Sequence, residues 1–170
     1  AVGAEGVDRR IDVIATAMRA RLAAPDLMDL DLAYAPPYGQ AKDPVNQTGM
    51  VAHNVLTGEL VLTGPDALTE DMPVLDVRTV GEYAAGHMPN SLNIPHTQLR
   101  DRLDEVRAWV DENVGDQPFV VMCAAGVRSW IGYRIVRHAG FNVTMLSGGI
   151  QTLRAWLGEK AEAVLGKGGG

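Results

Sequence analysis

Hydrophobic and polar residues follow two different patterns before and after about residue 58 of the chain. In the first part, apolar residues recur three and four positions apart, which places one set on a single helix face: Ile11, Ile14, Ala15, Met18 and Leu22. From residue 60 onward, short apolar runs alternate with segments of helical period, as is typical of a parallel sheet covered by helices. The pattern therefore predicts a helical segment over residues 1–58 and an α/β domain over residues 59–160.

A second helix of the N-terminal segment is predicted from its end signals. Asp43 suits the N-cap, Pro44 the first helical position, and Gly58 the C-terminal stop. The run before it, Tyr-Ala-Pro-Pro-Tyr-Gly at residues 34–39, contains two prolines and a glycine, which prevent regular backbone pairing. We therefore expect an irregular loop between two helices. The exposed apolar stripe of this helical segment favours self-association.

Short apolar runs in the second part are the predicted strands, at residues 60–62, 74–77, 91–94, 119–122 and 143–146. Helices are predicted between these runs from start and stop signals. A capping box of Thr79 and Glu82 begins the first helix, which stops at Gly86, and an apolar stripe from Leu99 to Val110 marks the second, which stops near Gly115. The third helix buries Ile131 and Ile135 and ends at Ala139-Gly140. The paired Gly148-Gly149 precedes a last helix from Ile150 to Leu157. This order of elements predicts a parallel sheet covered by helices.

Composition and charge narrow the function classes. The 170 residues carry a formal net charge of −6 without a Lys/Arg-rich run, so we expect no nucleic acid partner. The sequence shows no leader and no apolar stretch near membrane-spanning length, which predicts a cytoplasmic protein without a membrane partner. Its single cysteine cannot form an internal disulfide, which fits a reducing compartment. Because the chain begins with Ala1 and ends in glycines, we expect a piece of a longer chain with a flexible tail at residues 161–170.

The single cysteine, Cys123, follows an apolar run and precedes a helix-like segment. Residues between them read as a tight turn, in which Gly126 gives permissive backbone, Arg128 a fixed positive charge and Ser129 a cap for the helix. Backbone N–H groups of such a turn, with the positive end of the helix, favour an anion. A thiol placed there ionises more readily, and the thiolate is the nucleophile. The alternative is an inert thiol that acts as a small buried hydrophobe.

Several motifs, in this order along the chain, resemble the rhodanese homology family: Asp76-Val77-Arg78, Tyr83 to Pro89, the cysteine loop, and Leu146 to Ile150. The resemblance covers about residues 60–160. It implies an α/β fold with a five-stranded parallel sheet flanked by helices on both faces, and sulfur transfer through a persulfide on Cys123. One departure is Asn90-Ser91, where the family has Gly-Ala, and we expect it to alter a turn without touching the chemistry.

The length of the cysteine loop distinguishes two kinds of enzyme. Four residues lie between Cys123 and Arg128, whereas phosphatases of the Cys-loop kind need five. The shorter loop fits a single sulfur atom on the thiol, whereas a tetrahedral phosphate needs a wider cradle of N–H groups. The count therefore favours sulfur transfer, with phosphatase activity as the lesser alternative.

A mechanistic hypothesis assigns roles to the loop residues. Cys123 is the nucleophile that takes a sulfane sulfur from thiosulfate, a polysulfide or a thiol persulfide and passes it to a thiol acceptor. Arg128 holds an anionic donor and favours the thiolate. Main-chain N–H groups cradle the persulfide in a substrate loop that consists of Ala124, Ala125, Gly126, Val127, Arg128 and Ser129. The rival hypothesis is a persulfide-relay or binding module with little turnover of its own.

Further residues are candidates for supporting roles. Asp76 and Arg78 form either an ion pair that braces the loop or a strand-end pair with a purely structural role. The family position of His87, shortly before Pro89, is structural, so we interpret His87 as a hydrogen-bonded framework histidine rather than an acid–base group. The remaining histidines have no partner at ligand spacing, so no metal site is predicted.

The N-terminal segment carries a second resemblance. Residues 6–12 and 34–46 look like the end of the dimerisation domain of flavin-dependent pyridine nucleotide-disulfide oxidoreductases, especially coenzyme A-disulfide reductases, some of which carry a C-terminal rhodanese domain. This implies the C-terminal part of a reductase–rhodanese fusion, in which Tyr34 or Tyr38 reaches a partner's active site and a homodimer is allowed. The chain lacks a Gly-x-Gly-x-x-Gly run after a strand, so FAD, NAD(P)H and coenzyme A are expected only in the parent protein.

Overall fold

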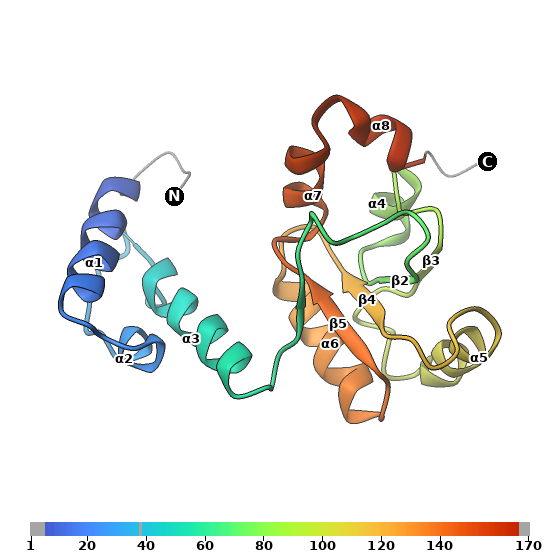
Figure 1. Cartoon of the computed structure of the whole chain (residues 1–170), viewed down its shortest axis with the longest axis horizontal. Coiled ribbons are helices and arrows are strands. Elements are labelled where there is room, and N and C mark those ends of the chain that lie inside the picture. Colours follow the sequence, from blue (N-terminus) through green and yellow to red (C-terminus); the bar gives the residue numbers. More distant parts are fainter. Residues whose placement is uncertain (1–5, 38, 167–170) are drawn as a thin grey trace. The chain divides into compact units, whose positions relative to one another are not determined.

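Two units make up the chain, Ala1–Leu60 and Val61–Gly170, in a computed structural model that describes residues 6–37 and 39–166. We call them the first unit and the second unit. In its described part the first unit contains α1 (Val7–Arg19), α2 (Ala24–Met28) and α3 (Pro44–Leu56), drawn in blue to turquoise in Figure 1. The strands lie in the second unit.

Within the first unit, α2 packs closely against α3. A Cβ atom added at Gly49 would lie 2.8 Å from Cβ of Leu27 and from the backbone nitrogen of Met28, so this approach of the two helices requires glycine. The side-chain amide of Asn46 donates hydrogen bonds to the carbonyl groups of residues that end or follow α2: Leu27, Met28 and Leu30. The sequence pattern did not predict α2, because a helix of five residues depends on such contacts more than on its own propensity.

The start of α3 is fixed by the predicted N-cap. The Asp43 carboxylate accepts a hydrogen bond of 2.9 Å from the backbone N–H of Val45, and Pro44 is the first helical residue. Arg10 of α1 donates from Nε and Nη2 to the same carboxylate at 3.0–3.1 Å. Burial raises the pKa of Asp43, but the Arg10 and Val45 interactions outweigh it and hold the pKa below its usual range. Asp43 therefore joins α1 to α3.

The second unit contains a five-stranded parallel sheet in the order β1-β5-β4-β2-β3. Its strands are β1 (Leu62–Thr63), β2 (Val74–Asp76), β3 (Ser91–Asn93), β4 (Phe119–Met122) and β5 (Val143–Leu146). Its helices are α4 (Val80–Ala84), α5 (Leu103–Asn113), α6 (Val127–His138), α7 (Gly149–Leu157), a 3₁₀ turn (Gly158–Lys160) and α8 (Ala161–Val164). The predicted α/β fold with a five-stranded parallel sheet is confirmed.

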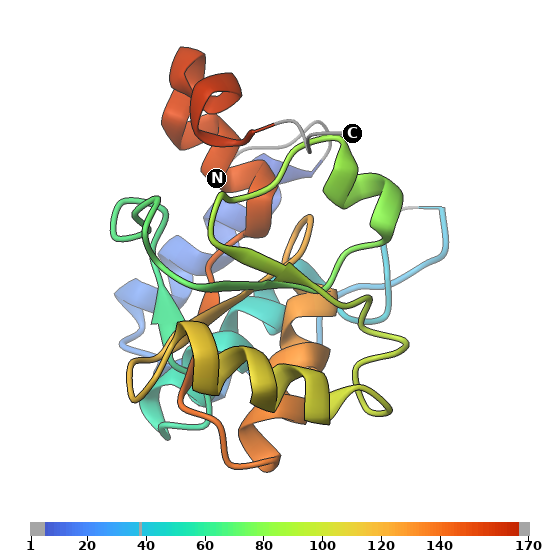
Figure 2. The same cartoon turned by 90° about the vertical axis from the view of Figure 1, so that its right-hand side faces the viewer.

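Alternate residues along the strands face two helical layers. Val74, Val120, Met122 and Leu146 belong to a buried cluster with residues of the chain's last helices: Ile150, Leu153, Ala161 and Leu165. On the other face, Gly132 of α6 lies close to β4, because an added Cβ would be 3.3 Å from a methyl group of Val121. Figure 2 shows the two layers, with α7 and α8 in red above the sheet and α5 and α6 in yellow and orange below it.

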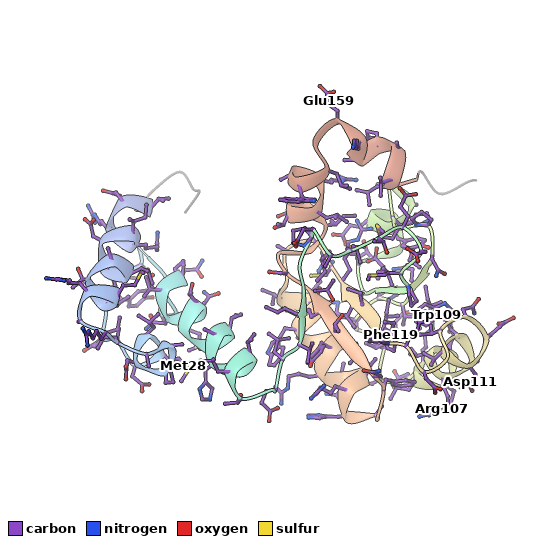
Figure 3. The ribbon with its side chains drawn as sticks, viewed as in Figure 1. Met28, Arg107, Trp109, Asp111, Phe119 and Glu159 are labelled. Carbon is purple, nitrogen blue, oxygen red and sulfur yellow. The ribbon has the colours of Figure 1, made fainter. Side chains whose placement is uncertain are left out.

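Aromatic contacts fix the lower layer against the sheet. The ring of Trp109 on α5 packs edge-on against Phe119 at the start of β4, with centroids 5.5 Å apart (Figure 3). Phe119 also meets Phe141 at 6.0 Å, and the guanidinium of Arg107 lies 5.0 Å from the centre of the Phe141 ring. These contacts position β4, the strand that leads into Cys123.

Some element boundaries differ from the sequence prediction. The first strand begins at Leu62 rather than at Leu60, because the Leu60 N–H donates to the carbonyl of Asn54 at the end of α3. The helix predicted from Leu99 begins at Leu103. Ile135 is buried as predicted, but Ile131 is 43% exposed, because the residues that α6 turns inward include Gly132, Tyr133, Ile135 and Val136.

The tail expected from residue 161 is also corrected. Ala161–Val164 form α8, and Ala161 and Leu165 are buried in the cluster beneath it. The backbone N–H of His87 donates to the carbonyl of Gly166 at 3.2 Å. Residues 167–170 of the expected tail lie outside the described residues. The described part of the chain end therefore covers one face of the sheet.

Candidate functional site

Cys123 lies directly after β4 and before α6, so the strand, turn and helix predicted around it are present. Gly126 is the N-cap of α6 and has φ of 117°, a conformation that side chains rarely adopt. This turn reverses the chain within three residues of the thiol. As the carboxyl ends of parallel strands share one edge of a sheet, Cys123 lies at the edge where sheets of this kind bind ligands.

The sulfur of Cys123 is surrounded by hydrogen-bond donors. The backbone N–H of Gly126 points to Sγ at 3.2 Å. Burial raises the pKa of the thiol, since the residue is only 1% exposed, but donors around the sulfur outweigh it and the pKa lies below its ordinary value. The donors are the Ser129 hydroxyl and the backbone N–H groups of Gly126, Ser129 and Ala125. This arrangement stabilises negative charge on sulfur.

Ser129 has a different position from the one predicted. It was expected to cap α6, but Gly126 is the N-cap and Ser129 lies inside the first turn of the helix. It is fully buried, and its hydroxyl has no hydrogen-bond partner in the described part of the chain. The hydroxyl is one of the groups that lower the pKa of Cys123. A buried hydroxyl without another partner is thus available to the sulfur atom.

The outer side of the cysteine loop is held by the start of α7. The N–H of Ile150 donates to the carbonyl of Cys123 at 2.8 Å, and that of Gln151 to the carbonyl of Ala124 at 3.1 Å. At Gly149, with φ of 63°, an added Cβ would lie 2.5 Å from the Cys123 carbonyl oxygen. Glycine is therefore required there. The sequence prediction treated the paired glycines only as a helix start and missed this contact.

Arg128 forms an ion pair with Glu82 of α4. Its Nη1 and Nη2 donate to Oε2 and Oε1 of Glu82, both at 2.7 Å. The same carboxylate accepts from the N–H and hydroxyl of Thr79, and the Glu82 N–H donates back to that hydroxyl, which completes the predicted capping box. The Arg128 hydrogen bonds hold the pKa of Glu82 well below its usual range, and Glu82 raises the pKa of Arg128. The link to Arg128 was missed, because 46 residues separate the pair.

Asp76 and Arg78 form the second ion pair near the loop. Arg78 donates from Nε and Nη2 to the Asp76 carboxylate at 2.6–3.0 Å, and both side chains are buried. Arg78 Nη2 also donates to the carbonyl of Gly86 at 2.8 Å, and the Asn93 amide donates to the carbonyls of Asp76 and Arg78. The pair thus joins β2, β3 and the end of α4. Its role in bracing the cysteine loop stays a prediction.

His87 makes framework contacts away from the sulfur. Its Nδ1 lies 3.0 Å from the carbonyl oxygen of Tyr83, and the two rings stack with centroids 3.9 Å apart. Within residues 6–37 and 39–166, no cluster of three or more His, Cys, Asp and Glu side chains has metal-binding geometry. Of the two tyrosines considered earlier, Tyr34 is exposed, whereas Tyr38 lies outside the described residues.

Comparison with known proteins identifies the second unit. Residues 64–155 match the model of the rhodanese-like domain. The reduced CoADR-RHD protein of Bacillus anthracis superimposes with a TM-score of 0.81 and 37% identity, over 91% of this chain and 27% of that chain. An NAD-dependent persulfide reductase from A. fulgidus superimposes with a TM-score of 0.75 and 40% identity, over 87% of this chain and 26% of that chain.

A shorter match links the chain to a named reductase. The coenzyme A disulfide reductase of Staphylococcus aureus strain bovine RF122 is 50% identical over 52 residues, which are 31% of this chain and 12% of that protein. The chain therefore spans about an eighth of this curated relative and about a quarter of the two solved relatives. Both resemblances stated from the sequence are confirmed. Across the described ranges, no helix is both long and apolar enough to span a membrane.

Proposed function

Because this chain belongs to the rhodanese-like domain family, we propose that it is a sulfurtransferase that carries a sulfane sulfur on Cys123. The observation that supports this most directly is the set of donors around the buried thiol, which holds its pKa below the ordinary value. A sulfur atom bound to Sγ carries the same negative charge and meets the same donors. The other members of the substrate loop, Ala124 and Val127, contribute backbone rather than side-chain chemistry.

The proposed reaction has two balanced steps. The Cys123 thiolate attacks the outer sulfur of the donor, a new S–S bond forms, and the donor's own bond to that sulfur breaks. Its leaving group departs with the electron pair, as sulfite from thiosulfate or as a thiolate from a thiol persulfide. A thiolate acceptor then attacks the outer sulfur on Cys123 and leaves as a persulfide. Cys123 returns as the thiolate, and no oxidant or reductant is consumed.

A relay function inside a larger protein is the second candidate. The relatives named CoADR-RHD and NAD-dependent persulfide reductase are each about four times as long as the region they share with this chain. A domain in that setting passes sulfur to a neighbouring domain and needs little turnover alone. In this version, FAD, NAD(P)H and coenzyme A act in the parent protein, and a cytoplasmic location and a homodimer are part of the proposal.

Intact mass spectrometry tests the sulfurtransferase proposal. We expect wild-type protein exposed to thiosulfate, polysulfide or a thiol persulfide to gain one sulfur atom with at least one of these donors. The Cys123→Ser variant gains none, and it is the matched control because it changes one atom. If no donor loads the wild-type thiol, the proposal is wrong.

Turnover distinguishes the enzyme from the relay module. The loaded protein is mixed with a thiol acceptor, and repeated transfer is followed with excess donor. A sulfurtransferase completes many cycles as the isolated chain. A relay module loads once and releases sulfur slowly, but it turns over when it is part of the longer reductase–rhodanese protein.

A further inference from the structure

We infer that Glu82 sets the donor preference of the Cys123 site, by neutralising Arg128 and so disfavouring small anionic donors. This inference rests on the proposed sulfur transfer and names the class of donor that the site favours. It concerns a positioning residue, because Glu82 acts on the reacting sulfur through Arg128. Arg128 was predicted to hold an anionic donor, and in the structure its guanidinium pairs with Glu82.

Arg128 presents its fork of donors to a protein carboxylate. Nη1 and Nη2 are both engaged, at 2.7 Å, in the paired geometry that an arginine uses for carboxylates and oxyanions. A thiosulfate that uses the same face of the guanidinium must displace Glu82. The competitor is covalently tethered and present at all times, so a dissolved anion starts at a disadvantage.

Glu82 is also held in place from its own side. Thr79 donates its backbone N–H at 3.0 Å and its hydroxyl at 2.8 Å to the carboxylate. The first of these bonds, together with the bond of 3.3 Å that the Glu82 N–H donates to the Thr79 hydroxyl, forms the capping box of α4, so moving the Glu82 carboxylate away from Thr79 breaks the helix start. The carboxylate is consequently ionised and positioned without any ligand in the site.

The residues beside this ion pair are apolar and exposed. Val80 next to the capping box is 66% exposed, and Val127 next to Arg128 is 73% exposed. With Arg128 neutralised, the starts of α4 and α6 carry a balanced ion pair and two exposed apolar side chains. This surface suits an organic thiol persulfide, whose carbon chain can cover apolar area, better than a small inorganic dianion.

Alkylation of Cys123 measures this effect without sulfur transfer. Iodoacetate and iodoacetamide are similar in size, and each loses iodide to the thiolate, but only the first is an anion. We compare the ratio of their rates on the whole 170-residue chain at low ionic strength. Because both reagents need the same thiolate, a changed thiol pKa cancels in the ratio. Cys123 is the single cysteine, so one site is reported.

Substitution of both partners gives a distinctive set of outcomes. In Glu82→Gln the ratio of iodoacetate to iodoacetamide rates rises about fivefold, the effect of roughly one unpaired charge near the surface. Gln keeps the acceptor for Thr79, so α4 remains capped. In Arg128→Gln the ratio falls, because the Glu82 carboxylate is then unpaired. In the double variant it returns close to the wild-type value. Added salt reduces each difference.

Glu105→Gln is the matched control, because Glu105 forms the same kind of ion pair with Arg102 on the surface of α5. Its ratio stays at the wild-type value. A ratio in Glu82→Gln within twofold of wild type overturns the inference, as does an equal rise in Glu105→Gln. Mass-spectrometric loading of sulfur decides the proposed function separately, since alkylation requires only a reactive thiol.

Discussion

Two arginine–carboxylate ion pairs lie beside the cysteine loop, and they differ in burial. In the Asp76–Arg78 pair the side chains are 0% and 5% exposed, whereas in the Glu82–Arg128 pair they are 37% and 26% exposed. In the first pair, Arg78 also donates to the carbonyl of Gly86, and Asp76 belongs to β2, which pairs with β3. The second joins α4 to α6 across the surface. The same chemistry therefore occurs once inside the fold and once at its rim.

The difference in burial gives the two ion pairs different roles, one in the structure and one in the selection of a ligand. A buried ion pair has lost its hydration, so removing one partner leaves a charge that nothing replaces. A surface pair stays hydrated and is screened by salt, so its net contribution to stability is small. We therefore expect the inner pair to hold the sheet edge together and the outer pair to influence what reaches the thiol.

The largest effect is expected from Asp76→Ala. It leaves the Arg78 guanidinium buried without its carboxylate, and the free energy of unfolding of the second unit falls by about 3–5 kcal/mol. Urea unfolding followed by circular dichroism measures the change. Asp111→Ala, on the outer side of α5, is the control and changes the free energy of unfolding little. A decrease in the free energy of unfolding below about 1 kcal/mol in Asp76→Ala would mean that the inner pair contributes no more to stability than an ordinary surface pair.

Gly149→Ala tests the contact between the start of α7 and the cysteine loop. The added Cβ lies 2.5 Å from the Cys123 carbonyl oxygen, so the loop or the start of α7 has to shift. The variant loses about 1–3 kcal/mol of stability from overpacking, and sulfur loading slows because the backbone N–H groups leave the thiol. Gly115→Ala is the matched control, since Gly115 also has positive φ but no atom within 4 Å of the added Cβ. Equal losses in both variants would show that strain rather than the clash is responsible.

Ser129→Ala addresses the thiol itself. Removing the buried hydroxyl takes away a donor that lowers the pKa of Cys123, while burial still raises it. The pKa of the thiol therefore rises, and the midpoint of iodoacetamide alkylation against pH moves to higher pH. The Cys123→Ser variant supplies the blank reaction. An unchanged midpoint would mean that the backbone N–H groups alone favour the thiolate.

The sequence predicted the contacts that are local in the chain. The cap of Asp43 on α3, the capping box of Thr79 and Glu82, and the pairing of Asp76 with Arg78 each involve residues two or three positions apart. Their geometry follows from the helix or strand end on which they lie. The strands could be predicted equally well, because buried parallel strands appear in the sequence as short apolar runs.

Contacts between distant segments could not be predicted in the same way. Many residues of opposite charge could pair with Glu82 or with Arg128, and the spacing of the two residues in the sequence does not identify the partner. The docking of α7 on the carbonyls of Cys123 and Ala124 depends on the order of strands in the sheet. Ser129 was misassigned because a serine near a helix start resembles a cap, whereas the turn at Gly126 begins α6 earlier and buries the hydroxyl.

The smallest change in stability is expected from Glu82→Gln. The pair is partly exposed and screened by solvent, so the free energy of unfolding falls by about 0–1 kcal/mol at neutral pH. The pKa of Glu82 is lowered in the folded state, so the pair's contribution is present above the pKa of the unfolded side chain, about 4.3, and is lost as the pH falls through the folded value. The difference between wild type and variant should therefore be constant from pH 7 to about pH 5 and shrink in more acidic solution. Urea titrations at several pH values measure it. A loss as large as that of Asp76→Ala would show that the outer pair is structural, and the donor preference assigned to Glu82 would then need the alkylation ratio to support it independently.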